Sequence, residues 1–294
     1  MNCNICPREC GADRENGKKG VCGCDNKILL ARAALHHWEE PPISYKKGSG
    51  TIFFCGCNLG CVFCQNREIS RNSVGKAVTP ERLYEIFYEL KNQGAHNINL
   101  VTPTHYTEQI LPVLKRAKKE KFPLPIIWNS GGYEKATTIE KLRGLVDIYL
   151  PDLKYINPET AQKYSRAADY FEYASKAIDE MVFQCPTPIV HRGTMRKGVI
   201  VRHLILPGLA EESKKIIEYL HGRYGNKIYI SIMNQYTPIK EIESTYPEIY
   251  RRVTEEEYNS VVEFAKNIGV ENAFIQEGDT ATESFIPRFD NFGV

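Results

Sequence analysis

The stretch Phe54-Cys-Gly-Cys57-Asn-Leu-Gly-Cys61-Val-Phe-Cys64-Gln-Asn66 brings three closely spaced cysteines directly after a short apolar segment, 52–54. Iron–sulfur clusters bind proteins through cysteine thiolates, and a cubane 4Fe–4S cluster held only by protein needs four of them. A loop that offers three leaves one iron free for another group, as an open catalytic metal site does. Cys55 stays outside this set, because alternation along the preceding strand turns it elsewhere. The spacing of Cys57, Cys61 and Cys64 therefore predicts a 4Fe–4S cluster at which chemistry takes place.

Size and charge exclude several other classes of protein. The chain has 294 residues and a net charge of +2, with 38 basic and 36 acidic side chains. This balance gives no electrostatic reason to expect nucleic acid or a membrane surface as a partner. No apolar run is long enough to span a bilayer, and the first 30 residues are rich in cysteine and charge, unlike a signal peptide. We expect a cytoplasmic location.

The cysteines are concentrated at one end of the chain. Nine of the ten lie in the first 64 residues. A disulfide framework is typical of short secreted chains, whereas clustering in a longer chain favours metal sites. The distribution therefore favours two metal sites over a disulfide network.

Beyond residue 50 the sequence alternates strand-like and helix-like segments, which is typical of a parallel sheet or barrel. The expected strands are 52–54, 97–101, 124–128, 146–150, 198–205, 227–232 and 273–276. The expected helices follow Thr79-Pro80 and Thr254, cover 106–120, 138–143, 158–165 and 169–183, and include Ile216 to Tyr224. Six β-α units are too few for a closed eightfold barrel. We therefore predict an α/β fold, an open partial (β/α)6 TIM-like barrel.

The composition of residues 1–48 differs from that of 49–294, so we predict an N-terminal cysteine-rich module ahead of the barrel. Within the module, the spacing of four cysteines suits a metal site with four thiolates. These are Cys3, Cys6, Cys10 and Cys22. Spacing alone does not choose between zinc and a second iron–sulfur cluster. A zinc ion would stabilise the module, whereas a cluster would also permit electron relay.

The cysteine loop, placed after a first strand and before β-α repeats, resembles the radical S-adenosylmethionine superfamily. The resemblance narrows to PflX-type proteins, which are related to the pyruvate formate-lyase activating enzymes. Segments 57–66, 99–106, 149–155, 202–208 and 233–238 carry it, together with Cys3 to Gly11 and Gly20 to Gly23. This similarity covers nearly the whole chain. It implies a partial barrel of the radical SAM type, with three thiolates on the cluster and S-adenosylmethionine on the fourth iron.

The resemblance also implies cofactor contacts at predicted strand ends. It assigns cofactor binding to Phe63, Asn66, Thr102, Thr104, Asn129, Ser130, Asp152, Lys154 and His203, with catalytic roles for His203 and Lys154. Alternation puts Asp152 and Lys154 on one face, where a cation could meet the cofactor carboxylate and an anion its ribose or a monovalent metal. The alternatives are a solvated ion pair for these two, a cap and turn for the threonines and a core hydrogen bond for the histidine. Many superfamily members have Gly-Gly-Glu where the threonines stand, which leaves that contact open.

The activity implied by the resemblance is reductive cleavage of S-adenosylmethionine to methionine and a 5'-deoxyadenosyl radical, which then abstracts a hydrogen atom. The target would be a glycine of a partner glycyl-radical enzyme, another protein or a small molecule. Flavodoxin or ferredoxin would supply the electron. The hypothesis from another class is an iron–sulfur protein that only transfers electrons or senses. Release of 5'-deoxyadenosine would separate the two.

Overall fold

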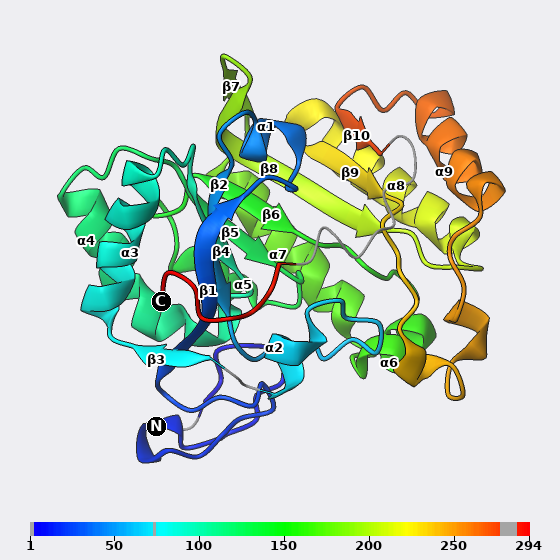
Figure 1. Cartoon of the computed structure of the whole chain (residues 1–294). Helices are drawn as coiled ribbons and strands as arrows, with labels where there is room; N and C mark the ends of the chain where they lie inside the picture. Colours follow the sequence, from blue (N-terminus) through cyan, green and yellow to red (C-terminus); the bar gives the residue numbers. More distant parts are fainter. Residues whose placement is uncertain (1–2, 73–74, 277–286) are drawn as a thin grey trace.

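A computed structural model describes residues 3–72, 75–276 and 287–294, and within them seven strands run parallel. They belong to a sheet with the order β10-β9-β8-β6-β5-β4-β2-β1-β3, which does not close on itself. The parallel strands are β2 (Ser49–Phe54), β4 (Ile98–Val101), β5 (Ile126–Ser130), β6 (Ile148–Pro151), β8 (Thr194–Leu204), β9 (Tyr229–Met233) and β10 (Ala273–Ile275). The predicted open partial barrel with six β-α units is confirmed (Figure 1).

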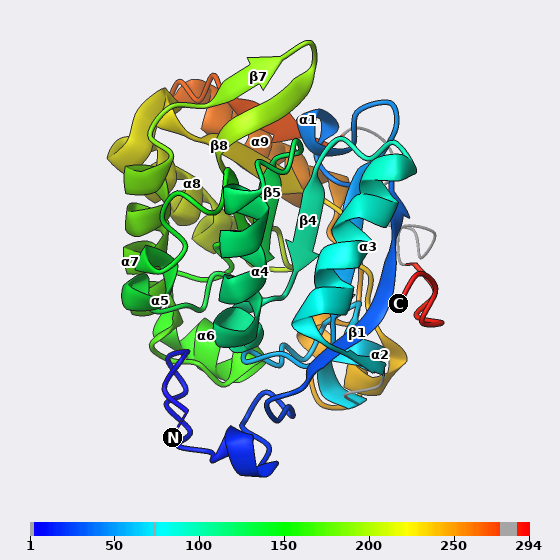
Figure 2. The same cartoon turned by 90° about the vertical axis from the view of Figure 1, so that its left-hand side faces the viewer.

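Helices connect the parallel strands and cover one face of the sheet (Figure 2). They are α3 (Pro80–Asn92), α4 (Thr107–Lys119), α5 (Ala136–Glu140), α6 (Pro158–Ser165), α7 (Tyr170–Gln184), α8 (Ala210–Tyr224) and α9 (Glu255–Asn267). Their starts follow local sequence signals. Thr79 caps α3 through a hydrogen bond from the Arg82 amide, and Thr254 with Glu257 forms a capping box on α9. None of the helices in the described ranges is long and apolar enough to cross a bilayer.

The sequence did not predict the antiparallel edge of the sheet. β1 (Ile28–His36) pairs antiparallel with β2 and with β3 (Lys76–Val78), while β7 (Ile189–His191) forms a hairpin with β8. β1 comes from the proposed N-terminal module, yet it is a strand of the main sheet. The cysteine segment that precedes β1 lies at one end of the sheet, below α2 (Arg67–Asn72) in Figure 1. The division at residue 48 stays a prediction.

The interior of the partial barrel is closed at one end by a short helix, α1 (Pro41–Ser44). Its Ile43 is fully buried against strand residues Ile127, Ile148 and Ile200. Burial of apolar area contributes about 25 cal/mol per Å², so this contact stabilises the closed end of the barrel. The strand ends at the other end carry the polar residues described next.

Candidate active site

A cavity of about 220 Å³ lies at the C-terminal ends of the parallel strands. All three cysteines of the loop, Cys57, Cys61 and Cys64, line it. Seven further predicted residues line the same cavity: Phe63, Asn66, Thr102, Asn129, Ser130, Asp152 and Lys154. This is the end at which α/β barrels carry their active sites. Residues up to 97 positions apart in sequence, from Cys57 to Lys154, thus meet at one site.

The cysteine loop is held in place by hydrogen bonds to its sulfurs. The Leu59 amide donates to the Cys57 sulfur at 3.4 Å, and the Ser165 hydroxyl donates to the Cys61 sulfur at 3.0 Å. The Ser70 hydroxyl lies 3.5 Å from the Cys64 sulfur. Donors around sulfur stabilise thiolates and tune the potential of a cluster that they bind. Each of the three sulfurs therefore has a partner suited to its charged form.

The three thiols of the loop suit an iron–sulfur cluster, which binds proteins through cysteine thiolates. In a cubane, each thiolate binds a different iron, so the sulfurs stand farther apart than around one ion. Burial raises the pKa of the Cys61 thiol to about 12, and the positive charge of Lys154 opposes this shift. A soft, multi-iron group that binds thiolates matches this donor set.

Asp152 and Lys154 form an ion pair at the cavity wall, and Arg202 completes the group. The Arg202 Nε donates to the Asp152 carboxylate at 2.8 Å, and its terminal nitrogens reach Asn129 at 2.7 Å and Glu39 at 3.4 Å. Burial disfavours charge on Asp152, but Arg202 and Lys154 hold its pKa below the ordinary value. Burial likewise disfavours charge on Lys154, but Asp152 raises its pKa. Both groups are therefore charged at neutral pH, as ligand recognition requires.

The turn after β5 is fixed by a buried carboxylate that the sequence prediction missed. Glu134 is fully buried and accepts hydrogen bonds from Ser130 at 2.5 Å, Trp128 at 2.8 Å and Thr104 at 2.8 Å. Gly132 has a φ of +77°, and a Cβ there would collide with the Asp152 carbonyl oxygen. Gly132 thus lets the chain approach the neighbouring strand end closely. The hydroxyls of Ser130 and Thr104 anchor this turn.

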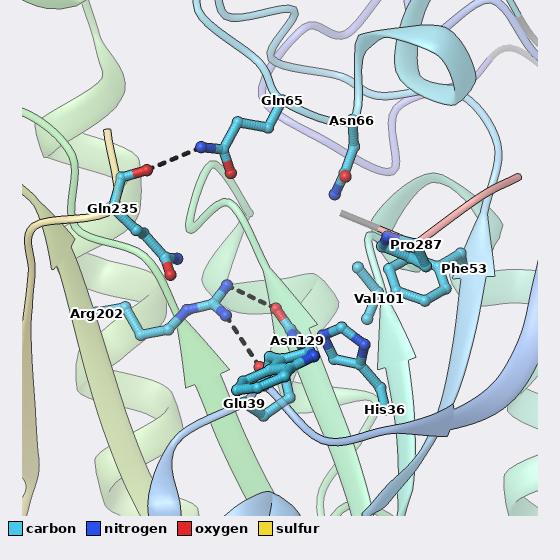
Figure 3. A pocket seen from close by; sticks show the side chains of 11 residues that line it. His36, Glu39, Phe53, Gln65, Asn66, Val101, Asn129, Arg202, Gln235 and Pro287 are labelled. Carbon is cyan, nitrogen blue, oxygen red and sulfur yellow. Dashed lines mark hydrogen bonds and ion pairs between the residues drawn. The ribbon is translucent and has the colours of Figure 1, made fainter. Parts of the chain in front are cut away.

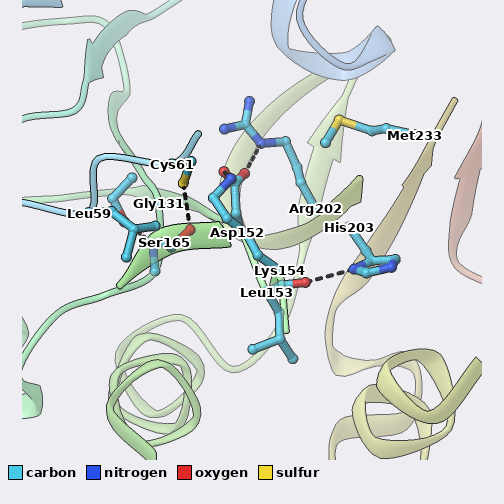
Figure 4. Close-up of polar contacts among 12 residues, drawn as sticks. Leu59, Cys61, Gly131, Asp152, Leu153, Lys154, Ser165, Arg202, His203 and Met233 are labelled. Atoms are coloured by element: carbon cyan, nitrogen blue, oxygen red, sulfur yellow. Dashed lines mark hydrogen bonds and ion pairs between the residues drawn. The ribbon is translucent and has the colours of Figure 1, made fainter. Parts of the chain in front are cut away.

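The structure does not bring His203 or Thr104 to the cavity. The His203 ring is buried on the other side of β8, with Nδ1 2.7 Å from the Leu153 carbonyl oxygen and Nε2 2.9 Å from the Ser213 hydroxyl. Figure 4 shows the ring turned away from Asp152, while the Arg202 guanidinium points toward it. Arg202 and His203 are neighbours on β8, and neighbouring residues of a strand face opposite sides, so only one of the two can face the cavity. Burial lowers the pKa of His203 to about 4, as expected for a core histidine.

A second, smaller cavity of about 130 Å³ adjoins the first. Both share the side chains of Gln65, Asn66, Val101, Asn129, Arg202 and Gln235. The second is also lined by His36 and Glu39 of the N-terminal region, and Figure 3 shows Glu39 beside Arg202. The Gln65 side-chain amide bridges to the Gln235 carbonyl oxygen at 2.8 Å across the boundary. The two cavities therefore form adjoining parts of one site.

The predicted N-terminal cysteines lie close to one another in the folded chain. A Cβ on Gly20 would meet the Cys10 sulfur at 3.0 Å and the Cys22 sulfur at 3.6 Å. Burial raises the pKa of the Cys6 thiol, and neighbouring Cys22 and Cys3 contribute in the same direction. The segment also holds the cluster loop, since the Cys57 amide donates to the Cys22 carbonyl oxygen at 3.3 Å. The predicted cysteines therefore lie in a segment that packs on the cluster loop, and their assignment as a second metal site stays a prediction.

Sequence reasoning missed several residues that line the two cavities. Arg202 stands beside the predicted His203, and its position became evident only through its bridge to Asp152, the residue after β6. Glu39 reaches the site because β1 belongs to the sheet, which the alternation pattern does not reveal. Gln235 follows β9 within the quoted segment 233–238, where the strand end could have indicated it.

Fold, cysteine loop and cavity together define a site that resembles those of radical S-adenosylmethionine proteins, and family comparison agrees. The model of the Radical SAM superfamily matches residues 51–220, more than half of the chain. The chain belongs to the radical SAM superfamily. This family implies a 4Fe–4S cluster and S-adenosylmethionine.

Individual relatives extend the comparison. An uncharacterized protein of Methanocaldococcus jannaschii is 30% identical over 280 residues, which cover 92% of this chain and 76% of the relative. The structure is similar to that of Streptococcus suis SuiB bound to S-adenosylmethionine, with a TM-score of 0.53 and 15% identity. That match covers 76% of this chain and 49% of SuiB, so the chain spans about half of SuiB's length. At this identity the likeness shows the fold alone, and membership of the PflX-type group stays a prediction.

Proposed function

We propose that this chain is a radical SAM enzyme whose Cys57, Cys61 and Cys64 bind the cluster and whose cavity binds S-adenosylmethionine. The observation that carries the proposal is the opening of all three thiols onto one cavity that also contains a charged Asp152–Lys154 pair. When bound, the cluster supplies one electron to S-adenosylmethionine, which yields methionine and a 5'-deoxyadenosyl radical that abstracts a hydrogen atom. The protein's task is to position the cofactor and exclude competing reactions.

Individual residues have separate parts in this proposal. Lys154 offers its ammonium group to the carboxylate of the cofactor, while Asp152 offers acceptors to the ribose hydroxyls. Asn129, held by Arg202, adds an amide at the next strand end. Leu204 and Met233 give the cavity an apolar side, which limits access of water to a reactive carbon radical.

We also propose a glycine of a partner glycyl-radical enzyme as the hydrogen donor. The adjoining cavity supports this, since it shares Asn129 and Arg202 with the cofactor cavity and a glycine can enter it without a side chain. A different protein or a small molecule is the alternative within the same chemistry. Transfer of deuterium from a labelled candidate into deoxyadenosine would identify the donor, and unlabelled product would exclude that candidate.

The test of the reaction is release of 5'-deoxyadenosine and methionine from anaerobically reconstituted, dithionite-reduced protein. We expect Cys61→Ala to abolish release and iron uptake at this loop. Cys55→Ala is the matched control, because Cys55 is fully buried and does not line the cavity. Absence of both products from the iron-loaded wild type would instead favour a protein that only transfers or senses electrons.

We further propose that Cys3, Cys6, Cys10 and Cys22 bind a second metal. The Cys10 and Cys22 sulfurs near Gly20, and the effect of Cys3 and Cys22 on the pKa of Cys6, support this assignment. Iron, sulfide and zinc contents of wild type and Cys10→Ser distinguish the two metals. A loss of zinc in the variant would indicate a structural ion, and a loss of about four irons a second cluster. Identical metal contents would exclude the site.

A further inference from the structure

A third hollow, of about 460 Å³, adjoins the cysteine loop. Its walls come from the N-terminal cysteine segment, the loop, α2, the C-terminal end of α6 and the turn at η4 (Lys240–Ile242). Cys57, Gly60 and Ser70 line both cavities. The cysteine loop therefore borders both the proposed cofactor cavity and this surface hollow.

From this position we propose that the hollow is the docking surface for an acidic one-electron carrier protein. The inference deepens the proposed function, on which it rests, by locating where the electron enters. Reduction transfers one electron from the reduced carrier to the oxidised cluster, with no bond made or broken. A carrier on this surface can deliver the electron while the cofactor cavity is filled.

Two cysteines bring the hollow close to both proposed metal sites. Cys22 and Cys57 each line it, and the Cys57 amide donates to the Cys22 carbonyl oxygen at 3.3 Å. Between them Gly56 has a φ of +82° and no room for a side chain, because a Cβ would collide with the Cys24 sulfur. The two cysteine segments are thus packed backbone against backbone. A carrier bound in the hollow contacts residues of both proposed metal sites at once.

Charge on the hollow suits an acidic partner. Arg67 and Glu241 line it as an ion pair, so the positive excess of the hollow comes from Arg71 and Arg166. Arg71 also donates to the Cys61 carbonyl oxygen at 2.9 Å, which puts positive charge on the loop itself. The whole chain carries a net charge of only +2, so this local excess is not a general property of the surface. Complementary charge raises association rates and orients the encounter.

An apolar contact point accompanies the charges. Val21, next to Cys22, is 61% exposed, and the half-buried Tyr246 also lines the hollow. Transient electron-transfer complexes use small interfaces, so a few apolar groups within a charged rim suffice. The combination matches a carrier that docks briefly and leaves.

The experiment compares two reductants on the iron-loaded protein. Bleaching of cluster absorbance is followed with reduced flavodoxin, an acidic carrier, and with dithionite, which needs no docking surface. Arg166→Glu reverses an exposed charge on the hollow, whereas the arginine hydrogen bonds to the cysteine loop among the described residues come from Arg8 and Arg71. Lys115→Glu on α4, far from α2 and α6 in Figure 1, is the matched control.

We expect Arg166→Glu to slow reduction by flavodoxin about tenfold at low salt and to weaken flavodoxin binding in a titration, with dithionite reduction unchanged. Lys115→Glu should behave as wild type, and added salt should slow the wild type with flavodoxin only. Unchanged flavodoxin rate and affinity in iron-loaded Arg166→Glu would overturn the docking inference alone. A wild-type chain that takes up no iron at Cys57, Cys61 and Cys64 would overturn the proposed function and this inference with it.

Discussion

Replacing Arg202 by Met removes the cation that holds the polar layer of the barrel together. The guanidinium is buried and contacts Asp152, Asn129 and Glu39 simultaneously. The exposed fractions of the three charged side chains, Arg202, Asp152 and Glu39, are only 16%, 12% and 10%. Met keeps most of the volume but leaves Glu39 without a cation, while Asp152 keeps Lys154.

Breaking a buried ion pair by removing one partner costs about 3–5 kcal/mol. We expect a loss of this size in the free energy of unfolding at pH 8. Burial raises the pKa of Glu39, and Arg202 opposes this rise, so the variant raises that pKa further. A carboxyl whose folded pKa exceeds its unfolded value contributes stability below the unfolded pKa and loses it as pH rises through the folded pKa. The deficit of the variant should therefore shrink toward pH 5, by about 1.4 kcal/mol for each unit of added rise.

The assay is anaerobic urea denaturation of wild type and variant at equal iron content, at pH 8 and pH 5. Arg223→Met is the matched control, because Arg223 pairs with Asp179 at 2.6 Å on the surface and the two are 50% and 36% exposed. An exposed pair contributes at most about 1 kcal/mol. A second variant, Arg202→Met with Glu39→Gln, should recover part of the loss. A deficit below about 1 kcal/mol at pH 8, or one that does not change with pH, would refute the proposed role of the network.

Three further variants test other parts of the molecule. His203→Gln should abolish an acid-induced loss of stability. The folded pKa of His203 is about 4, below the ordinary 6.5, so the free energy of unfolding of the wild type falls by up to about 3 kcal/mol as pH falls between these values. Equal urea midpoints of wild type and variant at pH 4.5 would contradict this. Glu40→Gln should have the opposite dependence. Burial raises the pKa of Glu40 to about 7 from 4.5, so the free energy of unfolding of the wild type falls by up to about 3 kcal/mol relative to the variant as pH rises to 8. The measurement is the same urea denaturation at several pH values. A difference between the two proteins that is constant with pH would exclude this effect. Tyr170→Phe removes a hydroxyl that lies 2.9 Å from the carbonyl oxygens of both Gly131 and Asp152 and shares its hydrogen between them. The change should cost about 1–3 kcal/mol and weaken S-adenosylmethionine binding in calorimetry. Unaltered affinity would show that this link does not position the cavity.

Local signals were sufficient for the alternation of parallel strands and helices. The caps at Thr79 and Thr254 and the apolar period along α3 and α9 depend on residues three and four apart, and the structure confirms them. The antiparallel strand β1 was missed, because its pairing with β2 joins segments about 20 residues apart through a connection without a hairpin signal. Because β1 was missed, Glu39 was also left unassigned, although it lines the adjoining cavity.

The sequence by itself determined the repeat of strand and helix, the three-cysteine loop and membership of the radical SAM superfamily, since spacing and local composition carry these features. The tertiary structure decided that Arg202 faces the cavity and His203 the core, because which side of a strand is inward depends on pairing with distant strands. It also decided that Cys22 packs on Cys57, which a linear sequence cannot show. Long-range pairing, not local preference, turned separate strand ends into one site.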